Sequence, residues 1–316
     1  MRMSRAVLAA VVITALYVAA LVWADSRNQV FSQLPRVAGT LPALMAMSLL
    51  SYVLRYARWH WLLLRTHSAG PLLDGWLAYL AGFAFTATPG KVGELVRIRY
   101  FQAQGVAPAR VLAAFVFERA LDLIVVGLIA TLSIHQPRLL GIALGFVATV
   151  LAVVVLLASK PALLGRASAY LRRRGFHGLA RTTRTLQTGL LGCRAWLNPL
   201  DISVALVLGG LAWSLTALSF VWLLVQLDIA LPAGLAFSLY PTAMLAGAAS
   251  MLPAGIGTTE VTLVALLAAH AVPVGTATLA AVGIRFSSLW FAVCCGFLAM
   301  ARLEFTARNR SILRAR

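Results

Sequence analysis

Long apolar segments alternate along the chain with short polar ones. Six of the apolar segments approach or exceed the roughly 18–20 residues that cross a bilayer as a helix. They occupy positions 7–23, 37–54, 111–134, 139–157, 202–225 and 277–301. The residue-by-residue alternation of apolar and polar positions that marks strands is missing from them. The pattern predicts an all-α polytopic membrane protein with about six full transmembrane helices.

The composition agrees with a lipid environment. The 316 residues are 61% hydrophobic and only 11% charged, whereas soluble domains carry roughly 25% charged residues. The formal net charge of +18 would suggest a nucleic acid partner in a soluble protein. In a membrane protein, basic residues gather in cytoplasmic loops, so we expect no nucleic acid partner. The three cysteines and five histidines have the spacing of neither a disulfide framework nor a metal site, and no metal or cofactor is expected.

A basic loop at 159–200 sets the predicted topology. It contains eight cations and no acid: Lys160, Arg166, Arg172, Arg173, Arg174, Arg181, Arg184 and Arg194. We predict that this loop and both basic termini are cytoplasmic, and that the segment at 7–23 is an uncleaved helix rather than a signal peptide. Anionic lipid head groups at the cytoplasmic face would attract these segments, although plain topogenic charge is the simpler interpretation of the loop.

Two interrupted segments, 72–104 and 231–271, must return to the side from which they enter if the basic parts are all cytoplasmic. The first arm, 72–87, has 16 residues, which is roughly 24 Å of helix against about 30 Å of hydrocarbon. We therefore predict two re-entrant helical hairpins, one opening inward and one outward. Irregular backbone at such depth is tolerated where it is buried in protein or faces a cavity.

The interruptions TPGKVGE and LPAGIGTTE resemble each other. Aligning Glu94 with Glu260 sets an offset of 260 − 94 = 166 residues, at which Arg119 meets Arg285. We predict an inverted-topology repeat, an arrangement whose discontinuous helices form the substrate site in many transporters. The predicted organisation is one transmembrane domain, 1–316, with repeats at 37–134 and 201–301.

The first interruption has the residues of an anion site. Thr88, followed by a proline, predicts a capped helix start whose backbone N–H groups attract anions, and Lys91 adds a full positive charge. Gly93 would let a ligand approach the backbone, which suits a phosphate head group. The alternative is a capped hairpin tip in which Glu94 only pairs with Arg97 one turn later.

The apolar segment at 111–134 contains FERALDL, with Glu118 and Asp122 four residues apart and Arg119 between them. Charges at this depth are costly unless paired or hydrated, so they and Arg285 are functional candidates. A purely structural set of ion pairs is the alternative. We also predict that the glutamates of the two interruptions each pair with one arginine of the pair Arg119 and Arg285.

A second charged motif, RYARWHWLLL, follows the segment at 37–54. Arg55 and Arg58 with Trp59 and Trp61 are typical of an anchor at the membrane interface, where cations snorkel and aromatic rings form a belt. A cytoplasmic entry point for lipid head groups is the alternative interpretation.

Five motifs, RYARWHWLLL, TPGKVGELVR, ERALDL, PAGIGTTE and GIRFSSLW, stand in this order over nearly the whole chain. Together they resemble the transmembrane-region family of lysylphosphatidylglycerol synthases. The resemblance implies a multi-pass lipid translocase of the bacterial cytoplasmic membrane, with signature positions Pro89, Gly93, Glu94, Arg97, Glu118, Arg119, Asp122, Gly255, Gly257, Glu260 and Arg285. The family commonly has glycine where Ala254 stands, and no soluble synthase domain follows here, so lipid aminoacylation is not carried over.

The predicted function is a flippase, not an enzyme, that moves a charged, phosphate-bearing phospholipid or isoprenoid-linked glycolipid. Alternatives are an integral-membrane transferase or phosphatase acting on lipid-linked phosphates, and a small-solute secondary transporter. The oligomeric state is left open, a homo-oligomer included. The candidate substrate-binding residues are Lys91, Gly93, Glu94, Arg97, Glu118, Arg119, Asp122, Gly255, Gly257, Glu260 and Arg285.

Overall fold

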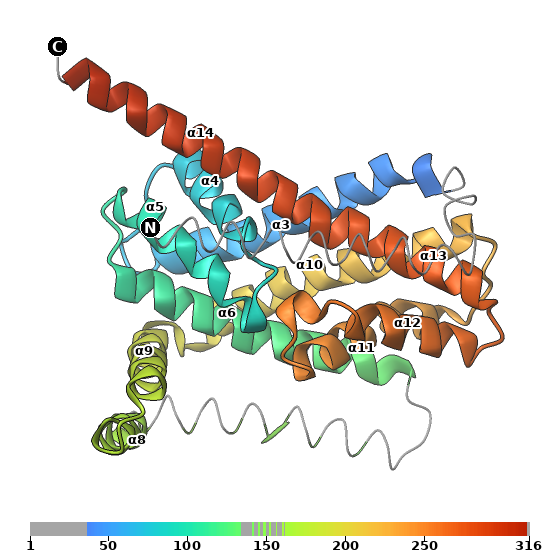
Figure 1. Cartoon of the computed structure of the whole chain (residues 1–316), viewed down its shortest axis with the longest axis horizontal. Coiled ribbons are helices and arrows are strands. Elements are labelled where there is room, and N and C mark those ends of the chain that lie inside the picture. Colours follow the sequence, from blue (N-terminus) through green and yellow to red (C-terminus); the bar gives the residue numbers. More distant parts are fainter. Residues whose placement is uncertain are drawn as a thin grey trace. The chain divides into compact units, whose positions relative to one another are not determined.

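The computed structural model describes residues 37–133, 160 and 162–314, with six further positions between 141 and 156. Over this part of the chain all regular structure is helical and no strand occurs, which confirms the predicted all-α class. The predicted span at 7–23, and nearly all of that at 139–157, lie outside the described residues. Figure 1 labels the main helices along the chain.

The helices longer than a single turn have the following bounds: α3 Leu41–Leu64, α4 Leu72–Phe83, α5 Arg97–Gln102, α6 Pro108–Ala130, α8 Ala162–Arg173, α9 His177–Cys193, α10 Pro199–Gln226, α11 Ala233–Ala249, α12 Thr258–Ala268, α13 Val274–Arg285 and α14 Phe291–Arg314. Shorter or tighter helical segments join them: η2 Pro89–Val96, η3 Thr131–Ser133, η4 Arg194–Trp196, η5 Pro253–Gly255 and η6 Phe286–Trp290.

Two stretches of the described chain are long and apolar enough to cross a bilayer, Pro199–Gln226 and Val274–Arg308. The second contains a π-helical turn, η6, directly after Arg285. Turns of this kind widen a helix by one residue and are frequent at functional sites. Helices α3 and α6 have 24 and 23 residues, but each carries charged side chains in its middle or second half.

Helix α3 continues to Leu64, about three turns beyond the end predicted at position 54. The motif RYARWHWLLL is therefore helical, and Arg55 and Arg58 project from a regular helix rather than from its end. Helix α6 begins where expected for its sequence: Ala107 has extended backbone angles and Pro108 occupies the first helical position, where its missing N–H costs nothing.

The chain forms two compact units. Within the described residues, the first comprises 37–52, Leu77–Val96 and 214–314, and the second comprises Val53–Trp76, 97–133 and 162–213. The division passes through α3, α4 and α10, and each unit has its own packing.

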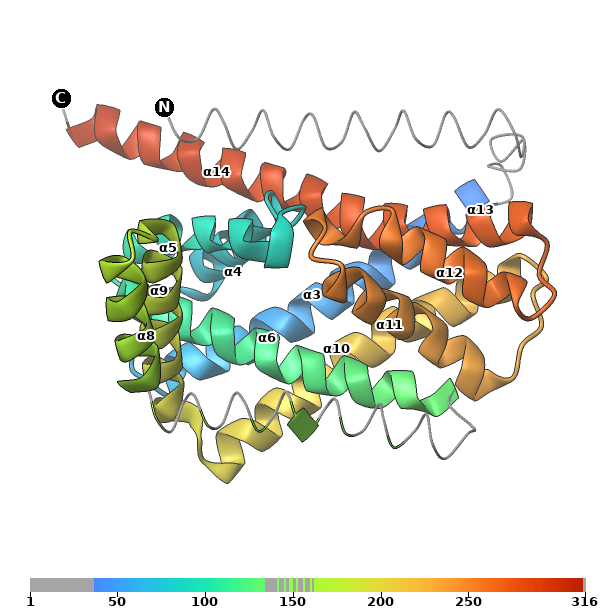
Figure 2. The ribbon, with the colours of Figure 1, turned by 60° about the horizontal axis from the view of Figure 1, so that its bottom comes forward.

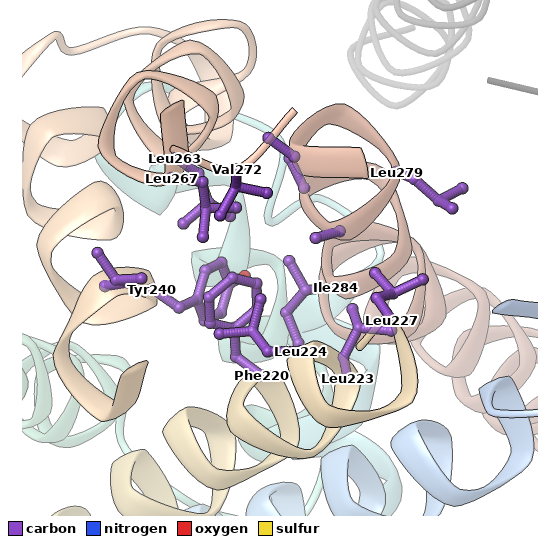
Figure 3. Close-up of a cluster of buried hydrophobic side chains, with 14 of the residues drawn as sticks. Phe220, Leu223, Leu224, Leu227, Tyr240, Leu263, Leu267, Val272, Leu279 and Ile284 are labelled. Atoms are coloured by element: carbon purple, nitrogen blue, oxygen red, sulfur yellow. The ribbon is translucent and has the colours of Figure 1, made fainter. Parts of the chain in front are cut away.

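In the first unit, α12 packs against both α11 and α13, and Figures 1 and 2 show the three helices side by side. Apolar side chains from α10 join them in one buried cluster, shown in Figure 3. The ring of Phe220 on α10 lies 5.7 Å from that of Tyr240 on α11, centroid to centroid. In lipid, close packing of this kind rather than exclusion of water holds helices together.

In the second unit, α6 packs against α5 and α9, and α8 packs against α9. Two glycines of α9 allow the close approach to α6: a side chain at Gly189 would meet Val116, and one at Gly192 would meet Ala113. Figure 2 shows α8 and α9 side by side, running across the direction of α6.

Candidate functional site

The first interruption begins a helical segment at Pro89, as predicted, but η2 is a 3₁₀ helix rather than an α-helix. Thr88 does cap it. Its hydroxyl accepts a hydrogen bond from the backbone N–H of Gly93 at 2.7 Å and donates one to the carbonyl of Phe85 at 3.0 Å. Lys91 lies on this segment, partly exposed, with φ of 56°.

Gly93 has a packing role that the sequence interpretation missed. A side chain at this position would lie 2.3 Å from the carbonyl oxygen of Phe85, so the chain itself occupies the space beside the glycine. The atom that lies close to Gly93 is therefore the carbonyl oxygen of Phe85, and not a ligand as predicted. The next residue, Glu94, is 1% exposed, and its Oε1 accepts a hydrogen bond from the hydroxyl of Thr86 at 2.9 Å.

The second interruption, η5, contacts η2 within the first unit. The two broken segments, which are 166 residues apart by the offset of their glutamates, are thus brought together, as predicted. That they form oppositely oriented re-entrant hairpins stays a prediction.

Arg285 holds the second interruption from both sides. Its Nε donates to Oε1 of Glu260 at 2.7 Å, and its Nη2 donates to the carbonyl of Ala254 at 2.9 Å. This confirms the predicted pairing of Glu260 with Arg285. Glu260 also accepts a hydrogen bond from the backbone N–H of Gly257 at 2.8 Å, which caps α12.

The backbone of this interruption requires unusual angles. Ala254, Gly255 and Gly257 all have positive φ, at 51°, 63° and 83°. Glycine adopts such angles readily. For Ala254 they cost energy, and its hydrogen bond to Arg285 helps to hold them. Gly255 is also packed against Gly247, where a side chain would meet backbone atoms of α11.

The second unit contains a denser group of charges, which we name the arginine–carboxylate cluster. Its members are Arg55 and Arg58 on α3, Arg97 on α5, and Glu118, Arg119 and Asp122 on α6. Glu118 and Asp122 are one helical turn apart and share a face of α6, which is why they can meet the same arginine.

Arg58 is at the centre of the cluster. It is fully buried, and its Nη2 lies 2.8 Å from Oε1 of Glu118 and 2.9 Å from Oδ1 of Asp122. Arg55 lies 3.4 Å from Asp122, and its guanidinium carbon is 4.5 Å from the ring centre of Trp213.

The other two arginines complete the surroundings of Glu118. Arg97 is fully buried, with Nη1 3.8 Å from Oε2 of Glu118 and its guanidinium carbon 4.8 Å from the ring centre of Trp59. Arg119 lies 3.4 Å from Glu118 and 3.1 Å from Asp122, and its side chain is 22% exposed. Arg119 is thus the most exposed member of the cluster.

Four guanidinium groups gather around two carboxylates in the cluster. Ionised side chains with little access to water are stable only when they are paired or hydrogen-bonded. The arrangement is chemically suited to binding a phosphate, because guanidinium groups donate pairs of hydrogen bonds to phosphate oxygens.

The interpretation of Arg55, Arg58 and Trp59 as an interfacial anchor is wrong. All three are buried, at 8%, 0% and 1% exposure: Arg55 and Arg58 belong to the cluster, and Trp59 lies against Arg97. The sequence does contain a signal for this arrangement: two arginines three residues apart in one apolar segment, and two carboxylates four residues apart in another.

A separate polar contact joins the ends of α3 and α10. Asp201, fully buried in the first turn of α10, accepts hydrogen bonds from Trp61 Nε1 at 2.9 Å and Arg65 Nε at 3.0 Å. Asn198 donates to the same carboxylate at 2.6 Å. Trp61 and Arg65 therefore fasten helix ends together, which is a structural role.

In the described part of the chain, no group of three or more His, Cys, Asp or Glu residues is placed to hold a metal ion. Cys193 is buried between α9 and α6 and donates to the carbonyl of Ala113 at 3.4 Å. Burial raises the pKa of this thiol to about 12, so it is inert rather than nucleophilic.

The motifs that form these sites are shared with a known family. The family profile described as "Lysylphosphatidylglycerol synthase TM region" matches residues 7–296, which include every residue of both interruptions and of the cluster. The chain belongs to this family. Lysylphosphatidylglycerol synthase transmembrane regions are integral, multi-pass membrane domains linked to lipid modification and flipping. The family match is to the transmembrane region, and no synthase domain is found. Among curated proteins, no match to the chain is found.

Proposed function

We propose that this member of the family is a lipid translocase that binds the phosphate-bearing head group of a phospholipid or isoprenoid-linked glycolipid. The observation that carries the proposal is the arginine–carboxylate cluster, in which four arginine side chains, three of them buried, converge on Glu118 and Asp122.

The donors are of the right kind for a phosphate. Arginine keeps its proton at all physiological pH values and offers a planar fork of N–H groups. Arg58 and Arg97 are held in place by carboxylate and aromatic neighbours, so little side-chain entropy would be lost when they bind a ligand. Arg119, the partly exposed member, is the one that an arriving head group would meet first.

The interrupted segments supply the moving parts of the proposed mechanism. Helix breaks of this type allow one half of an inverted repeat to shift against the other, which exposes a bound substrate to each leaflet in turn. The hydrogen bonds of Arg285 to Glu260 and Ala254 would hold the second break closed, and opening would require them to exchange for other partners.

The test begins with mass spectrometry of lipids that remain bound to gently purified protein. Leaflet exchange of the identified lipid is then measured in liposomes for the wild type and for Arg58→Gln, Arg97→Gln, Glu94→Gln and Glu260→Gln. Arg302→Gln, at an exposed position of α14 outside both sites, is the matched control. We expect exchange to fall at least tenfold in the two arginine variants and to be unchanged in the control.

Three results would overturn the proposal. Wild-type exchange in both Arg58→Gln and Arg97→Gln would remove the cluster from the substrate path. Chemical conversion of the lipid by the purified protein would identify a transferase or phosphatase. Uptake of a water-soluble anion without any lipid exchange would identify a small-solute transporter.

A further inference from the structure

Helix α8 lies outside the packed part of the second unit. None of its residues is buried, and it packs against α9. The contact uses one side of the helix, where the hydroxyl of Ser168 donates to the carbonyl of Ala180 at 2.8 Å and Gly165 lies against the side chain of Gln187. The opposite side faces away from α9.

That outer side mixes apolar and cationic residues. Leu163, Arg166, Tyr170 and Arg173 follow one another at spacings of three or four residues, so they form a single stripe along the helix. All four are exposed, with Leu163 at 42% and Tyr170 at 58%. Phe176, just beyond the end of the helix, is 56% exposed and extends the apolar part of the stripe.

The charge of the region has one sign only. From position 160 to 194 the chain has eight cations and no acid. The guanidinium of Arg174 lies 5.4 Å from the ring centre of Tyr170, which keeps charge and ring side by side on the surface. An exposed stripe of this composition is complementary to a surface with anionic groups on the outside and apolar groups directly beneath them.

The orientation of the helices fits such a surface. The last turns of α9 cross the first half of α6, with Gly189 against Val116 and Cys193 against the carbonyl of Ala113. In Figure 1, α8 and α9 are seen nearly end-on while α6 runs across the view, and Figure 2 shows the same crossing from another side. If α6 spans the membrane, a hairpin that crosses it near one end lies along the membrane plane.

We propose that the α8–α9 hairpin is a docking surface for an anionic phospholipid leaflet. Arg166, Arg173 and Arg174 bind lipid phosphates, while Leu163 and Tyr170 insert between the head groups, in the manner of interfacial amphipathic helices. The partner is the leaflet as a surface rather than one lipid held in a buried site. The proposal therefore does not depend on the proposed translocation or on the arginine–carboxylate cluster.

The full chain is tested in vesicles, with an environment-sensitive fluorophore on Ala167→Cys. This exposed residue lies one turn from both Leu163 and Tyr170. Cys294→Ala and Cys295→Ala remove the other accessible thiols, and Cys193 stays because it is buried. Emission and quenching by aqueous iodide are compared between vesicles of phosphatidylcholine alone and vesicles that also contain phosphatidylglycerol.

We expect the label to shift to shorter wavelength, with quenching at least threefold weaker, when phosphatidylglycerol is present. Molar salt should reverse the effect, because it screens the attraction. Replacing the three arginines together by Gln should abolish it, whereas replacing them by Lys should preserve it, since the attraction is to charge rather than to guanidinium geometry. Both variants change exposed side chains only, and equal thermal unfolding will show that they fold.

The proposal is overturned if the label is equally accessible to iodide in both kinds of vesicle. It is also overturned if the Gln variant keeps the full effect, or if the Lys variant loses it as the Gln variant does. The last outcome would indicate a specific arginine-binding partner in place of a charged leaflet.

Discussion

Arg285 and Glu260 form a buried ion pair, Nε to Oε1 at 2.7 Å, across 25 residues of sequence. The same guanidinium holds the carbonyl of Ala254 on the other side of the helix break. One side chain thus ties together three parts of the first unit: the π turn that follows α13, the tight turn of η5 and the start of α12. The stability of the second interruption depends on this contact.

Arg285→Gln should therefore destabilise the protein by about 3 kcal/mol, because it leaves a carboxylate uncompensated where water has little access. Glu260→Gln should cost less, since the amide oxygen still accepts from arginine and Glu260 is 14% exposed in its side chain. Thermal unfolding in detergent, with Arg302→Gln as the control, measures both. Equal costs for Arg285→Gln and the control would show that the ion pair contributes nothing.

The positive φ angles of the second interruption predict opposite effects for two substitutions. Ala254→Gly removes the strain of an alanine in the left-handed backbone conformation, but it also makes the unfolded chain more flexible. The net effect should be an unchanged free energy of unfolding or a gain of up to about 1 kcal/mol. Gly257→Ala should lower stability by about 1–2 kcal/mol. Its φ is 83° and no atom lies within 4 Å of the added methyl group, so the backbone conformation alone is the cause.

The same unfolding measurement checks this pair. Loss of stability in Ala254→Gly similar to that in Gly257→Ala would contradict the assigned backbone conformation at position 254. Gly210, which has ample space for a side chain and lies within a helix, provides a matched Gly→Ala control, expected to be neutral or stabilising.

Stability and substrate binding can be separated in the arginine–carboxylate cluster. Arg58→Gln alone should cost about 3–5 kcal/mol, because it removes the buried guanidinium that lies 2.8 Å from Glu118 and 2.9 Å from Asp122. Adding Asp122→Asn removes one of these charges, and we expect it to restore part of the stability. Leaflet exchange should stay at the low level of the single variant, because the missing guanidinium is the ligand for the phosphate.

A double-variant cycle on unfolding temperature and exchange rate measures this. Recovery of exchange together with stability would show that Arg58 serves the fold alone, and would count against a role in binding.

The raised pKa of Cys193 predicts that the free energy of unfolding decreases at alkaline pH. The thiol pKa is about 12 in the folded chain against an ordinary 9.0, so the folded state binds the proton more tightly than the unfolded state. The free energy of unfolding is unaffected by this thiol below about pH 9. Between pH 9 and pH 12 it falls by about 1.4 kcal/mol for each pH unit. Cys193→Ala should lack this component, and the difference between the two unfolding curves isolates it.

Alkylation gives an independent check at neutral pH. Because the thiolate is the reactive form and Cys193 is 4% exposed, N-ethylmaleimide should modify it only after denaturation. Rapid modification of the folded protein, seen by mass spectrometry of the peptide, would contradict its placement against α6.

The class of the protein and the positions of its helix breaks follow from the sequence by itself. Whether a segment prefers lipid depends on the sum of its own side chains, and whether a helix can continue depends on local proline and glycine residues. Both depend only on residues that are close together in the sequence. The pair Arg285–Glu260 could also be predicted from the sequence, because aligning the two similar motifs places an arginine 25 residues after each glutamate.

Only the tertiary structure shows which carboxylates pair with Arg55 and Arg58 of α3. Arg58 and Glu118 are 60 residues apart, and the sequence around Arg58 favoured an interfacial anchor. The pairing depends on which face of α3 meets which face of α6, and side-chain packing between distant segments sets that. The carbonyl of Phe85 beside Gly93 was hidden for the same reason: only the folded backbone shows which atoms fill the space that a glycine leaves.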